Sequence, residues 1–402
     1  MKFFFTTCFM LFLGIFSNFA QLSSGKLFVL HEGSSAQKGT IGYVDYATNT
    51  YTHIDSIARY GNQIEVHNQL LYVIEGLGNI RIYDIAANYM QVAVLDSVAA
   101  RGIAFWGNKM LVTSIEEPFF RVYEKTAPFN YLSGLASSAV RSEREEVIVV
   151  GQQAYLSGFY GDSVVYAVDL VNNTATMIET ALNPYQIEAI NGKVYVACFS
   201  YNADFTTNTA ISRINPATNT IDANLYLPYA DGFTSSNTQL YQKKSNGKVL
   251  TIDAALQVVD TTSVQGNFYG FQYDKISNNL FYSETDYVST GSVGYIQNTT
   301  LYPAISTNLS PRAFYFMSSA GVSVENTDIT KSFTVYPNPA KDVIFLQNLS
   351  VEGNDGYEIS DMAGKKCLVS AENNGQIEVS GLPEGVYFLQ IKGLVAKFVV
   401  SR

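Results

Sequence analysis

Short apolar runs separated by turn residues recur along most of the chain, and they predict its architecture. Successive runs begin about 39 to 45 residues apart. The seven runs are Leu27-Phe-Val, Leu71-Tyr-Val, Met110-Leu-Val, Ala154-Tyr-Leu, Val194-Tyr-Val, Gln239-Leu-Tyr and Leu280-Phe-Tyr. This period is typical of β-propeller blades, in which each repeat supplies one four-stranded sheet. The pattern therefore predicts an all-β chain built around a seven-bladed β-propeller, with almost no helix.

One copy shows the order of strands within a repeat. Strand patterns over residues 63–66, 70–74, 80–85 and 90–95 are separated by turn residues, for example His67-Asn-Gln69. The first copy starts at Lys26 with the second of these strands, so its innermost strand is missing. We expect Arg312–Met317 to supply that strand and to close the ring, because closure removes exposed sheet edges.

The last seventy residues or so follow a different pattern of strands. Alternating apolar residues in Phe333–Tyr336 and Val343–Leu346 predict two half-buried strands, and the Pro-Asn-Pro-Ala between them cannot continue a strand. Further strands are expected after Tyr357, after Ile377, and over 386–391 and 395–400, with turns between them. This segment is therefore expected to form a small immunoglobulin-like β-sandwich after the propeller.

Four ordered motifs in this segment resemble the C-terminal sorting domain of the type IX secretion system (Por secretion) of Bacteroidota. They are Tyr336-Pro-Asn-Pro-Ala-Lys-Asp342, Asp361-Met-Ala-Gly-Lys365, Leu382-Pro-Glu-Gly-Val-Tyr-Phe-Leu389 and the basic terminus from Lys397 to Arg402. The residues carrying the sorting motif are Tyr336, Pro337, Asn338, Pro339, Lys341, Asp342, Gly364, Gly385 and Tyr387. The resemblance implies contact with the secretion machinery, a secreted or outer-membrane cell-surface location, and removal of the domain during export. An ordinary immunoglobulin-like adhesion module is the alternative.

The beginning of the chain agrees with export. Lys2 precedes an apolar run from Phe3 to Phe16 that is too short to span a bilayer, and Ala20 precedes a plausible cleavage point at Gln21. We therefore interpret residues 1–20 as a signal peptide. The expected domains are then the propeller at 21–317, a linker at 318–331 and the sorting domain at 332–402.

Composition narrows the possible partners. The chain has 25 basic and 35 acidic residues, a net charge of −10 and 13% aromatic residues, and it shows no basic stripe, so nucleic-acid binding is disfavoured. Only Cys198 and Cys367 follow the signal peptide, in different expected domains, so no disulfide framework is expected. No later apolar run is long enough for a transmembrane helix. We expect a monomeric propeller.

The repeated region resembles the YVTN/YncE-like propellers and the related DUF5074-type surface propellers of Bacteroidota. Asn191-Gly-Lys-Val-Tyr-Val196 and Ile214-Asn-Pro-Ala-Thr-Asn219 carry this resemblance. These motifs are structural, so the resemblance implies the fold without indicating one activity.

A ligand site is expected on one face of the propeller, around the central channel. The loops that enter the innermost strands meet there with the loops that join the second and third strands. The ligand-binding candidates are Gln63, Arg101, Tyr185, Gln186, Asp231, Tyr269 and Arg312 from the first set of loops, and Glu75, Glu116 and Glu284 from the second. Guanidinium groups, amides and phenol rings in such a cluster can hydrogen-bond to a sugar or a peptide and stack against it.

The sequence contains few motifs that are typical of catalytic sites. His31, His53 and His67 lack the spacing of metal ligands, and no nucleophile elbow or phosphate-binding loop occurs in a suitable context. We interpret the paired acids Glu116-Glu117 and Glu145-Glu146 as solvated surface residues.

Two function classes remain open. We favour a non-enzymatic secreted or cell-surface propeller that binds an extracellular glycan, peptide or protein and needs no cofactor. The alternative is a secreted lyase or hydrolase that acts on an extracellular polymer with rim carboxylates, for which a divalent metal is possible.

Overall fold

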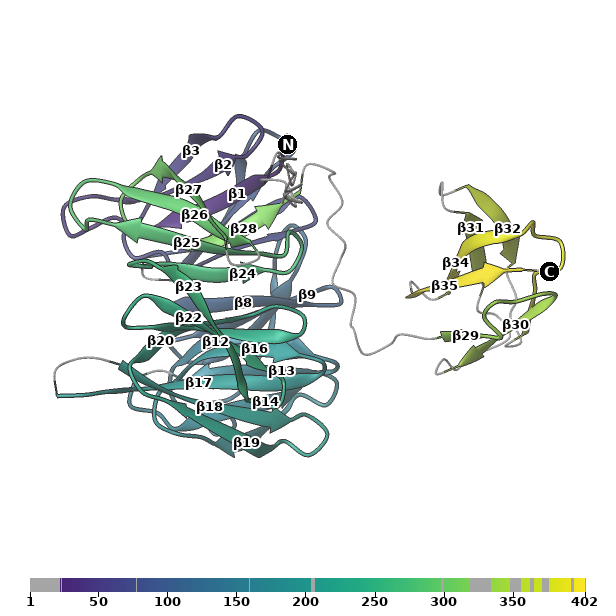
Figure 1. Ribbon diagram of the computed structural model, residues 1–402. Helices are drawn as coiled ribbons and strands as arrows, with labels where there is room; N and C mark the ends of the chain where they lie inside the picture. Colours follow the sequence, from purple (N-terminus) through teal and green to yellow (C-terminus); the bar gives the residue numbers. More distant parts are fainter. Residues whose placement is uncertain are drawn as a thin grey trace, which may run out of the picture.

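The chain consists of β-strands and turns throughout the residues that the computed structural model describes (Figure 1). The described residues are 22, 24–76, 78–158, 160–203, 207–297, 300–318, 334–347, 356–361, 365–370, 376–391 and 394–401. The predicted signal peptide lies outside them, and so does the predicted linker apart from Ser318.

Between Lys26 and Met317, seven of the described sheets contain four antiparallel strands each. We number them sheets 1 to 7 and give their strands from the innermost outwards. Sheet 1 contains β28 (Pro311–Met317), β1 (Lys26–His31), β2 (Gly39–Asp45) and β3 (Thr50–Ile57). Sheet 2 contains β4 (Gln63–His67), β5 (Leu70–Glu75), β6 (Asn79–Asp84) and β7 (Met90–Leu95). Sheet 3 contains β8 (Ala100–Trp106), β9 (Lys109–Ser114), β10 (Phe120–Glu124) and β11 (Tyr131–Gly134).

The other four sheets follow the same order. Sheet 4 contains β12 (Arg144–Val150), β13 (Gln153–Gly158), β14 (Val164–Asp169) and β15 (Thr174–Glu179). Sheet 5 contains β16 (Pro184–Ile190), β17 (Lys193–Tyr201), β18 (Thr207–Asn215) and β19 (Thr220–Leu227). Sheet 6 contains β20 (Ala230–Ser235), β21 (Gln239–Lys244), β22 (Lys248–Asp253) and β23 (Val258–Gln265). Sheet 7 contains β24 (Phe271–Asp274), β25 (Asn279–Thr285), β26 (Gly291–Gln297) and β27 (Thr300–Thr307).

The seven apolar runs of the sequence all lie in the second strand of a sheet, as predicted. Six of these strands are mostly buried because a neighbouring sheet covers each of their two faces, whereas in β21 buried residues alternate with half-buried ones. Hydrophobic clusters accordingly join adjacent sheets. In one of them, Tyr72 and Ile74 of sheet 2 pack with Met110 and Val112 of sheet 3.

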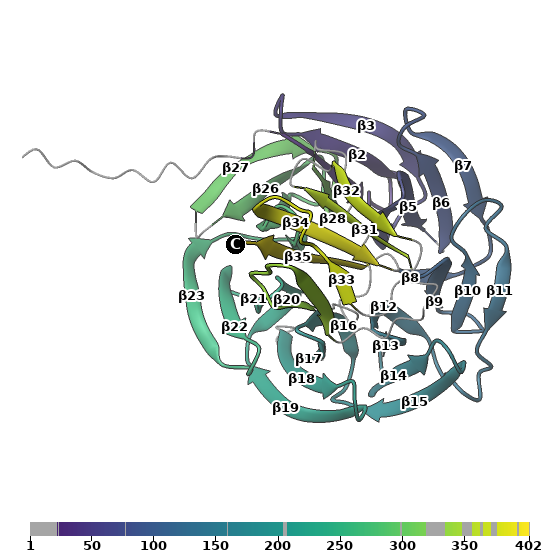
Figure 2. The ribbon, with the colours of Figure 1, turned by 90° about the vertical axis from the view of Figure 1, so that its right-hand side faces the viewer.

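The ring closes as expected. β28 pairs with β1 in antiparallel register, with Leu27 opposite Phe316, so the last strand of the repeated region completes the first sheet. Each innermost strand contacts the innermost strand of the next sheet, and β28 contacts β4. Figure 2 shows the sheets radiating around an axis that these strands surround. The predicted all-β propeller fold is confirmed.

The C-terminal unit has its own core. A three-stranded sheet of β29 (Thr334–Tyr336), β30 (Val343–Gln347) and β33 (Gln376–Glu378) accompanies a four-stranded sheet of β32 (Lys366–Ser370), β31 (Tyr357–Asp361), β34 (Gly385–Ile391) and β35 (Leu394–Val400). Their buried residues, including Ile344, Ile359 and Phe398, form one cluster. The expected small β-sandwich is therefore present.

The sorting-motif residues shape this sandwich where they are described. The Asn338 Oδ1 atom accepts a hydrogen bond from the Val399 N–H at 2.9 Å, and the Tyr387 hydroxyl donates to the Pro383 carbonyl at 2.9 Å. The Asp342 carbonyl accepts from the Val379 N–H at 2.7 Å. Gly364 lies outside the described residues.

Candidate functional site

The candidate site lies on the face of the ring at which the innermost strands begin, which we call the mouth face. Because the strands of each sheet run antiparallel in sequence, the loops between second and third strands also reach this face. The loops between the outermost strand and the next innermost strand reach it too. The sequence-based grouping of both loop sets on one face is therefore consistent with the topology.

A recurring β-bulge places the central side chains of this face. Where the innermost strands begin, the pairing with the second strand skips one residue, which is Arg101 in β8, Tyr185 in β16, Gly232 in β20 and Arg312 in β28. In β12 the irregularity falls at Glu145 and Glu146. A bulge redirects a side chain relative to the regular pleat. Here it turns Arg101, Tyr185 and Arg312 into one cluster.

Arg312 is the hub of that cluster. Its guanidinium forms an ion pair with Glu32, and its Nη2 atom donates to the Tyr185 hydroxyl oxygen at 3.2 Å. Glu32 also accepts a hydrogen bond from the Tyr269 hydroxyl, so both of its carboxylate oxygens are engaged. Burial alone lowers the pKa of Arg312, but the neighbouring Tyr185 and Glu32 raise it above its usual value, so the side chain remains charged.

Arg101 extends the cluster. Its Nε atom donates to Glu145 Oε2 at 2.6 Å, and its Nη2 atom pairs with the other oxygen of the same carboxylate. Burial raises the pKa of the Tyr185 hydroxyl, and the nearby charges of Arg312 and Arg101 lower it by less. Four predicted site residues, Arg101, Tyr185, Tyr269 and Arg312, are thus brought together.

Gln63 and Gln186 have a structural role that the sequence did not reveal. Gln63 Oε1 accepts a hydrogen bond from the Ile103 N–H of the next sheet at 2.7 Å, and Gln186 Oε1 accepts from the Phe233 N–H at 2.9 Å. Gln272 Oε1 and Glu146 Oε2 make the equivalent bond to the following sheet, at 3.1 Å and 2.9 Å. These side chains link successive innermost strands, and their contact with a ligand stays a prediction.

The four predicted acids fall into different environments. Asp231 pairs with Lys243 at 3.4 Å and is 40% exposed. Glu75 is buried. Its carboxylate pairs with Arg81 at 2.8 Å and accepts a hydrogen bond from the Ala58 N–H at 2.7 Å, and these partners compensate for its burial. Contact of Glu75 with a ligand stays a prediction. Glu116 and Glu284 are exposed.

The interpretation of Glu145-Glu146 as solvated surface residues is also wrong. Glu145 is 4% exposed beneath Arg101, and Glu146 lies in the bulge of β12. Burial raises the pKa of Glu146 to about 8, and Glu188 and Glu145 add to that shift, so its carboxyl is largely protonated at neutral pH. The pair Glu116-Glu117, in contrast, is exposed as expected.

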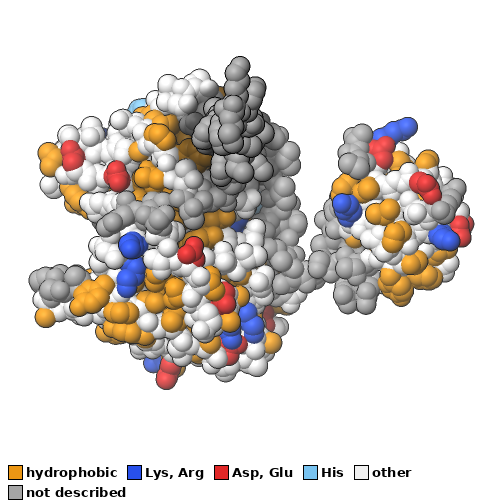
Figure 3. Space-filling model, in the orientation of Figure 1, with side chains coloured by type: hydrophobic (Ala, Val, Ile, Leu, Met, Phe, Trp, Pro, Cys, Tyr) orange, Lys and Arg blue, Asp and Glu red, His pale blue; other side chains and the backbone are white. Residues whose placement is uncertain are grey.

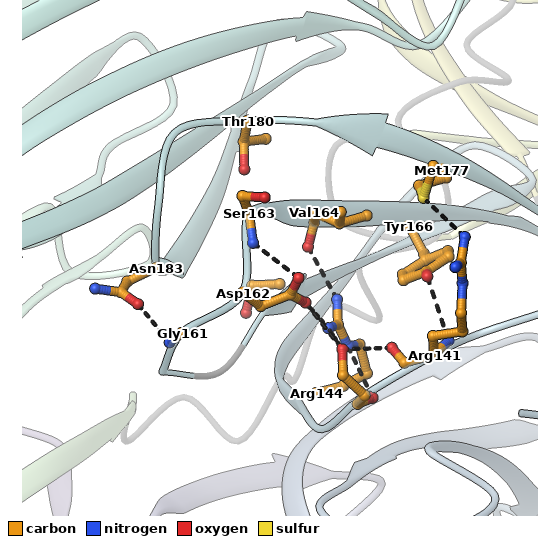
Figure 4. A network of polar contacts seen from close by, with 12 residues as sticks. Arg141, Arg144, Gly161, Asp162, Ser163, Val164, Tyr166, Met177, Thr180 and Asn183 are labelled. Atoms are coloured by element: carbon orange, nitrogen blue, oxygen red, sulfur yellow. Dashed lines mark hydrogen bonds and ion pairs between the residues drawn. The ribbon is translucent and has the colours of Figure 1, made fainter.

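Arg144 precedes Glu145 in the chain but belongs to a separate network of polar contacts, which Figure 4 shows. Its fully buried guanidinium pairs with Asp162 and donates to the Val164 carbonyl at 2.9 Å and to Ser142 Oγ at 2.6 Å. The chain between β13 and β14 is tied down further, because the Gly161 N–H donates to Asn183 Oδ1 at 2.6 Å. With its donors engaged inside the protein, Arg144 stabilises the loops around the mouth face.

Glu32 and Glu145 are the functional residues that sequence reasoning missed. Glu32 directly follows the second strand β1, and the proposed acids Glu75, Glu116 and Glu284 also lie at or near the ends of second strands, so this position was the available signal. Glu145 follows Arg144 at the start of an innermost strand. Nothing in the sequence indicates that Glu32 pairs with Arg312 of its own sheet, or that Glu145 pairs with Arg101 of sheet 3.

Two further features of the described residues concern metal ligands and surface charge. No group of three or more His, Cys, Asp and Glu side chains among them could hold a metal ion. Acidic and basic side chains are interspersed with uncharged ones on the side that Figure 3 shows.

Comparison with known families identifies the end of the chain. A family model described as the secretion system C-terminal sorting domain matches residues 334–400. The C-terminal unit is a sorting domain. Through this domain the protein uses the type IX secretion machinery and is directed to the cell surface or the extracellular space. No helix within the described ranges is long and apolar enough to cross a membrane.

Comparison with solved structures concerns the fold. A protein from Lactobacillus plantarum is 13% identical with a TM-score of 0.55, and the match covers 73% of this chain and 99% of that one. Hydrazine synthase from Kuenenia stuttgartiensis is 12% identical with a TM-score of 0.48, covering 64% and 95%. BamB from Moraxella catarrhalis is 15% identical with a TM-score of 0.42, covering 63% and 80%. No curated protein matched the chain.

Proposed function

We propose that the exported protein is a non-enzymatic ligand-binding module whose site is the cluster around Arg312 on the mouth face. The observation that carries this proposal is the convergence of Arg101, Tyr185 and Arg312, each the bulge residue of a different sheet. Backbone irregularities that aim side chains at one point are typical of functional sites. Charged and phenolic donors held by buried partners are pre-organised for binding, which lowers the entropy lost when a ligand is ordered.

The domain organisation is part of the same proposal. We place a signal peptide at residues 1–20, a seven-bladed YncE-like or DUF5074-type propeller at 21–317 and the sorting domain at 332–402. Seven four-stranded sheets and the closure of the ring by β28 support the propeller assignment.

The experiment is a calorimetric and thermal-shift screen of the purified protein against oligosaccharides and peptides. A ligand that binds the folded state raises the melting temperature. We expect a hit whose binding is lost in Arg312→Gln and retained in the matched control Arg213→Gln, since Arg213 lies on β18, the third strand of sheet 5, and pairs with Asp222. Binding that both variants retain equally would reject the mouth face as the site.

A further inference from the structure

The centre of the mouth face offers donors on its accessible side and keeps its carboxylates underneath. The Arg312 side chain is 37% exposed, whereas its partner Glu32 is 12% exposed. The Arg101 side chain is likewise more exposed than that of its partner Glu145, at 19% against 5%. Within the described part of the chain, the structure gives Arg312 two side-chain partners for its five N–H donors. A ligand that approaches the axis therefore meets donors before acceptors.

Exposed tyrosines surround this centre. Tyr60 and Tyr229 lie in loops that lead to innermost strands, while Tyr160, Tyr201 and Tyr287 lie where second strands turn towards third strands. All five side chains are between 52% and 75% exposed. Both kinds of loop reach the mouth face, so these phenol rings are distributed around Arg312 on several sheets. A tyrosine offers an apolar ring face and a polar hydroxyl, which suits stacking and hydrogen bonding with a sugar ring.

Three of these tyrosines occupy a backbone conformation that disfavours them. Tyr60, Tyr229 and Tyr287 have φ values of 65°, 53° and 59°. Positive φ is unusual for a bulky residue, and it persists at sites where a side chain serves a purpose other than stability. Asn or Gly would adopt these positions at lower cost. Tyr89, in a turn on the opposite face, has a φ of 60° as well, so it is the exposure of the rings on the mouth face that points to contact with a ligand.

We infer that the ligand is an acidic saccharide, a chain of sugar units with a uronic-acid carboxylate that pairs with Arg312 and with flanking sugars that stack on the mouth-face tyrosines. A guanidinium binds a carboxylate through two parallel hydrogen bonds, and the Tyr185 hydroxyl lies beside it to donate a third. The net charge of −10 opposes non-specific binding of a polyanion, so affinity must come from this local site. This inference rests on the proposed function and names the ligand class of the same site.

The test is isothermal titration calorimetry of the full protein with a matched pair of ligands, hexagalacturonate and its fully methyl-esterified form. The two differ in charge while the sugar rings are the same. We expect hexagalacturonate to bind and the ester to bind about 10- to 100-fold more weakly, as for loss of charge-assisted hydrogen bonds. Monomeric galacturonate should bind more weakly than the hexamer because it lacks the stacking sugars. Hexaglutamate, which carries carboxylates without sugar rings, is the third arm.

Substitutions of single residues test which side chains contact the ligand. Arg312→Gln should reduce affinity for hexagalacturonate to that of the ester, and Tyr185→Phe, which removes one hydroxyl, should reduce it less. Tyr201→Ala should weaken binding of the hexamer, whereas Tyr131→Ala, on the outermost strand of sheet 3 and 53% exposed, should not. If Arg312→Gln fails to fold, Tyr185→Phe and Arg312→Lys test the same contact.

The outcomes separate this inference from the proposed function. Equal binding of the acid and the ester, lost in Tyr185→Phe, would leave a binding module in place and overturn the carboxylate assignment. Preference for hexaglutamate over hexagalacturonate would overturn the saccharide class. Absence of binding for all of these probes would overturn this inference alone, whereas absence of any hit in the wider screen would overturn the proposed function as well.

Discussion

On the mouth face, some exposed tyrosines adopt a backbone conformation that lowers the stability of the fold. Tyr60 has a φ of 65° and a side chain that is 55% exposed. We predict that Tyr60→Asn raises the free energy of unfolding by about 0.5–1 kcal/mol, because Asn tolerates the left-handed region and little packing is lost. Urea denaturation followed by fluorescence measures this. A loss of stability larger than about 1 kcal/mol would show that the ring packs inside the fold. If the inference above holds, the same variant binds the acidic saccharide more weakly.

Glu146 supplies a prediction about pH. Burial raises the pKa of Glu146 from its ordinary value of 4.5 to about 8 in the folded protein, so the folded state retains a proton that the unfolded state loses. The stabilisation is complete below about pH 4.5 and disappears as the pH rises through 8. Glu146→Gln keeps the acceptor for the Ile187 N–H but does not titrate. We therefore expect the variant to gain stability relative to the wild type as the pH rises from 5 to 9, at about 1.4 kcal/mol per pH unit at most.

The equivalent position in the next sheet allows the reverse substitution as a control. Gln186 accepts the equivalent hydrogen bond from the Phe233 N–H in the next sheet. Gln186→Glu should introduce a new loss of stability with rising pH, in the direction opposite to Glu146→Gln. Denaturant melts at several pH values measure both. Parallel pH curves for the wild type and both variants would show that neither position is buried enough to shift a carboxyl pKa.

At the scale of elements, β28 decides whether the ring is closed. It joins the end of the repeated region to β1, and its Phe314 is 1% exposed in a cluster with Phe281 and Val293 of sheet 7. We predict that Phe314→Ala lowers the free energy of unfolding by about 3–5 kcal/mol, the cost of a large cavity between two sheets. Leu301→Ala on the outermost strand β27, 45% exposed, should change it by less than about 0.5 kcal/mol. Similar effects of the two substitutions would mean that β28 is not part of the cooperative core.

At the scale of the whole molecule, the arrangement of the strands could be predicted from the sequence, whereas most contacts between side chains could not. The apolar runs placed all second strands, and the missing first strand pointed to Arg312–Met317, because both follow from simple periodicity and from the closure of a ring. The topology brings the starts of β8, β16 and β28 to one face, but the bulges at Arg101, Tyr185 and Arg312 turn these side chains into one cluster. The buried position of Glu75 depends on pairing with Arg81, which a one-dimensional pattern does not specify. The bulges that aim the site are local changes of register, and they leave no periodic signal.

The two units of the chain have separate cores, and this leads to a prediction about export. The buried cluster of the sorting domain contains residues from Val335 to Val400, and no described cluster of the propeller shares a residue with it. We therefore predict that a chain ending at Ser318 retains the calorimetric unfolding transition of the propeller within about 2 °C. In the secreting cell the same truncation should abolish surface or extracellular appearance, because the sorting domain is missing.

Asn338→Ala is the finer variant, since it removes the two side-chain hydrogen bonds to the last strand at Val399 and Lys397 and leaves the propeller intact. It should lower the transition of the sorting domain and slow export while the propeller transition stays constant. Full export of the truncated chain would show that the propeller itself carries the export signal. A propeller transition that falls by many degrees on truncation would show that the two cores are energetically coupled.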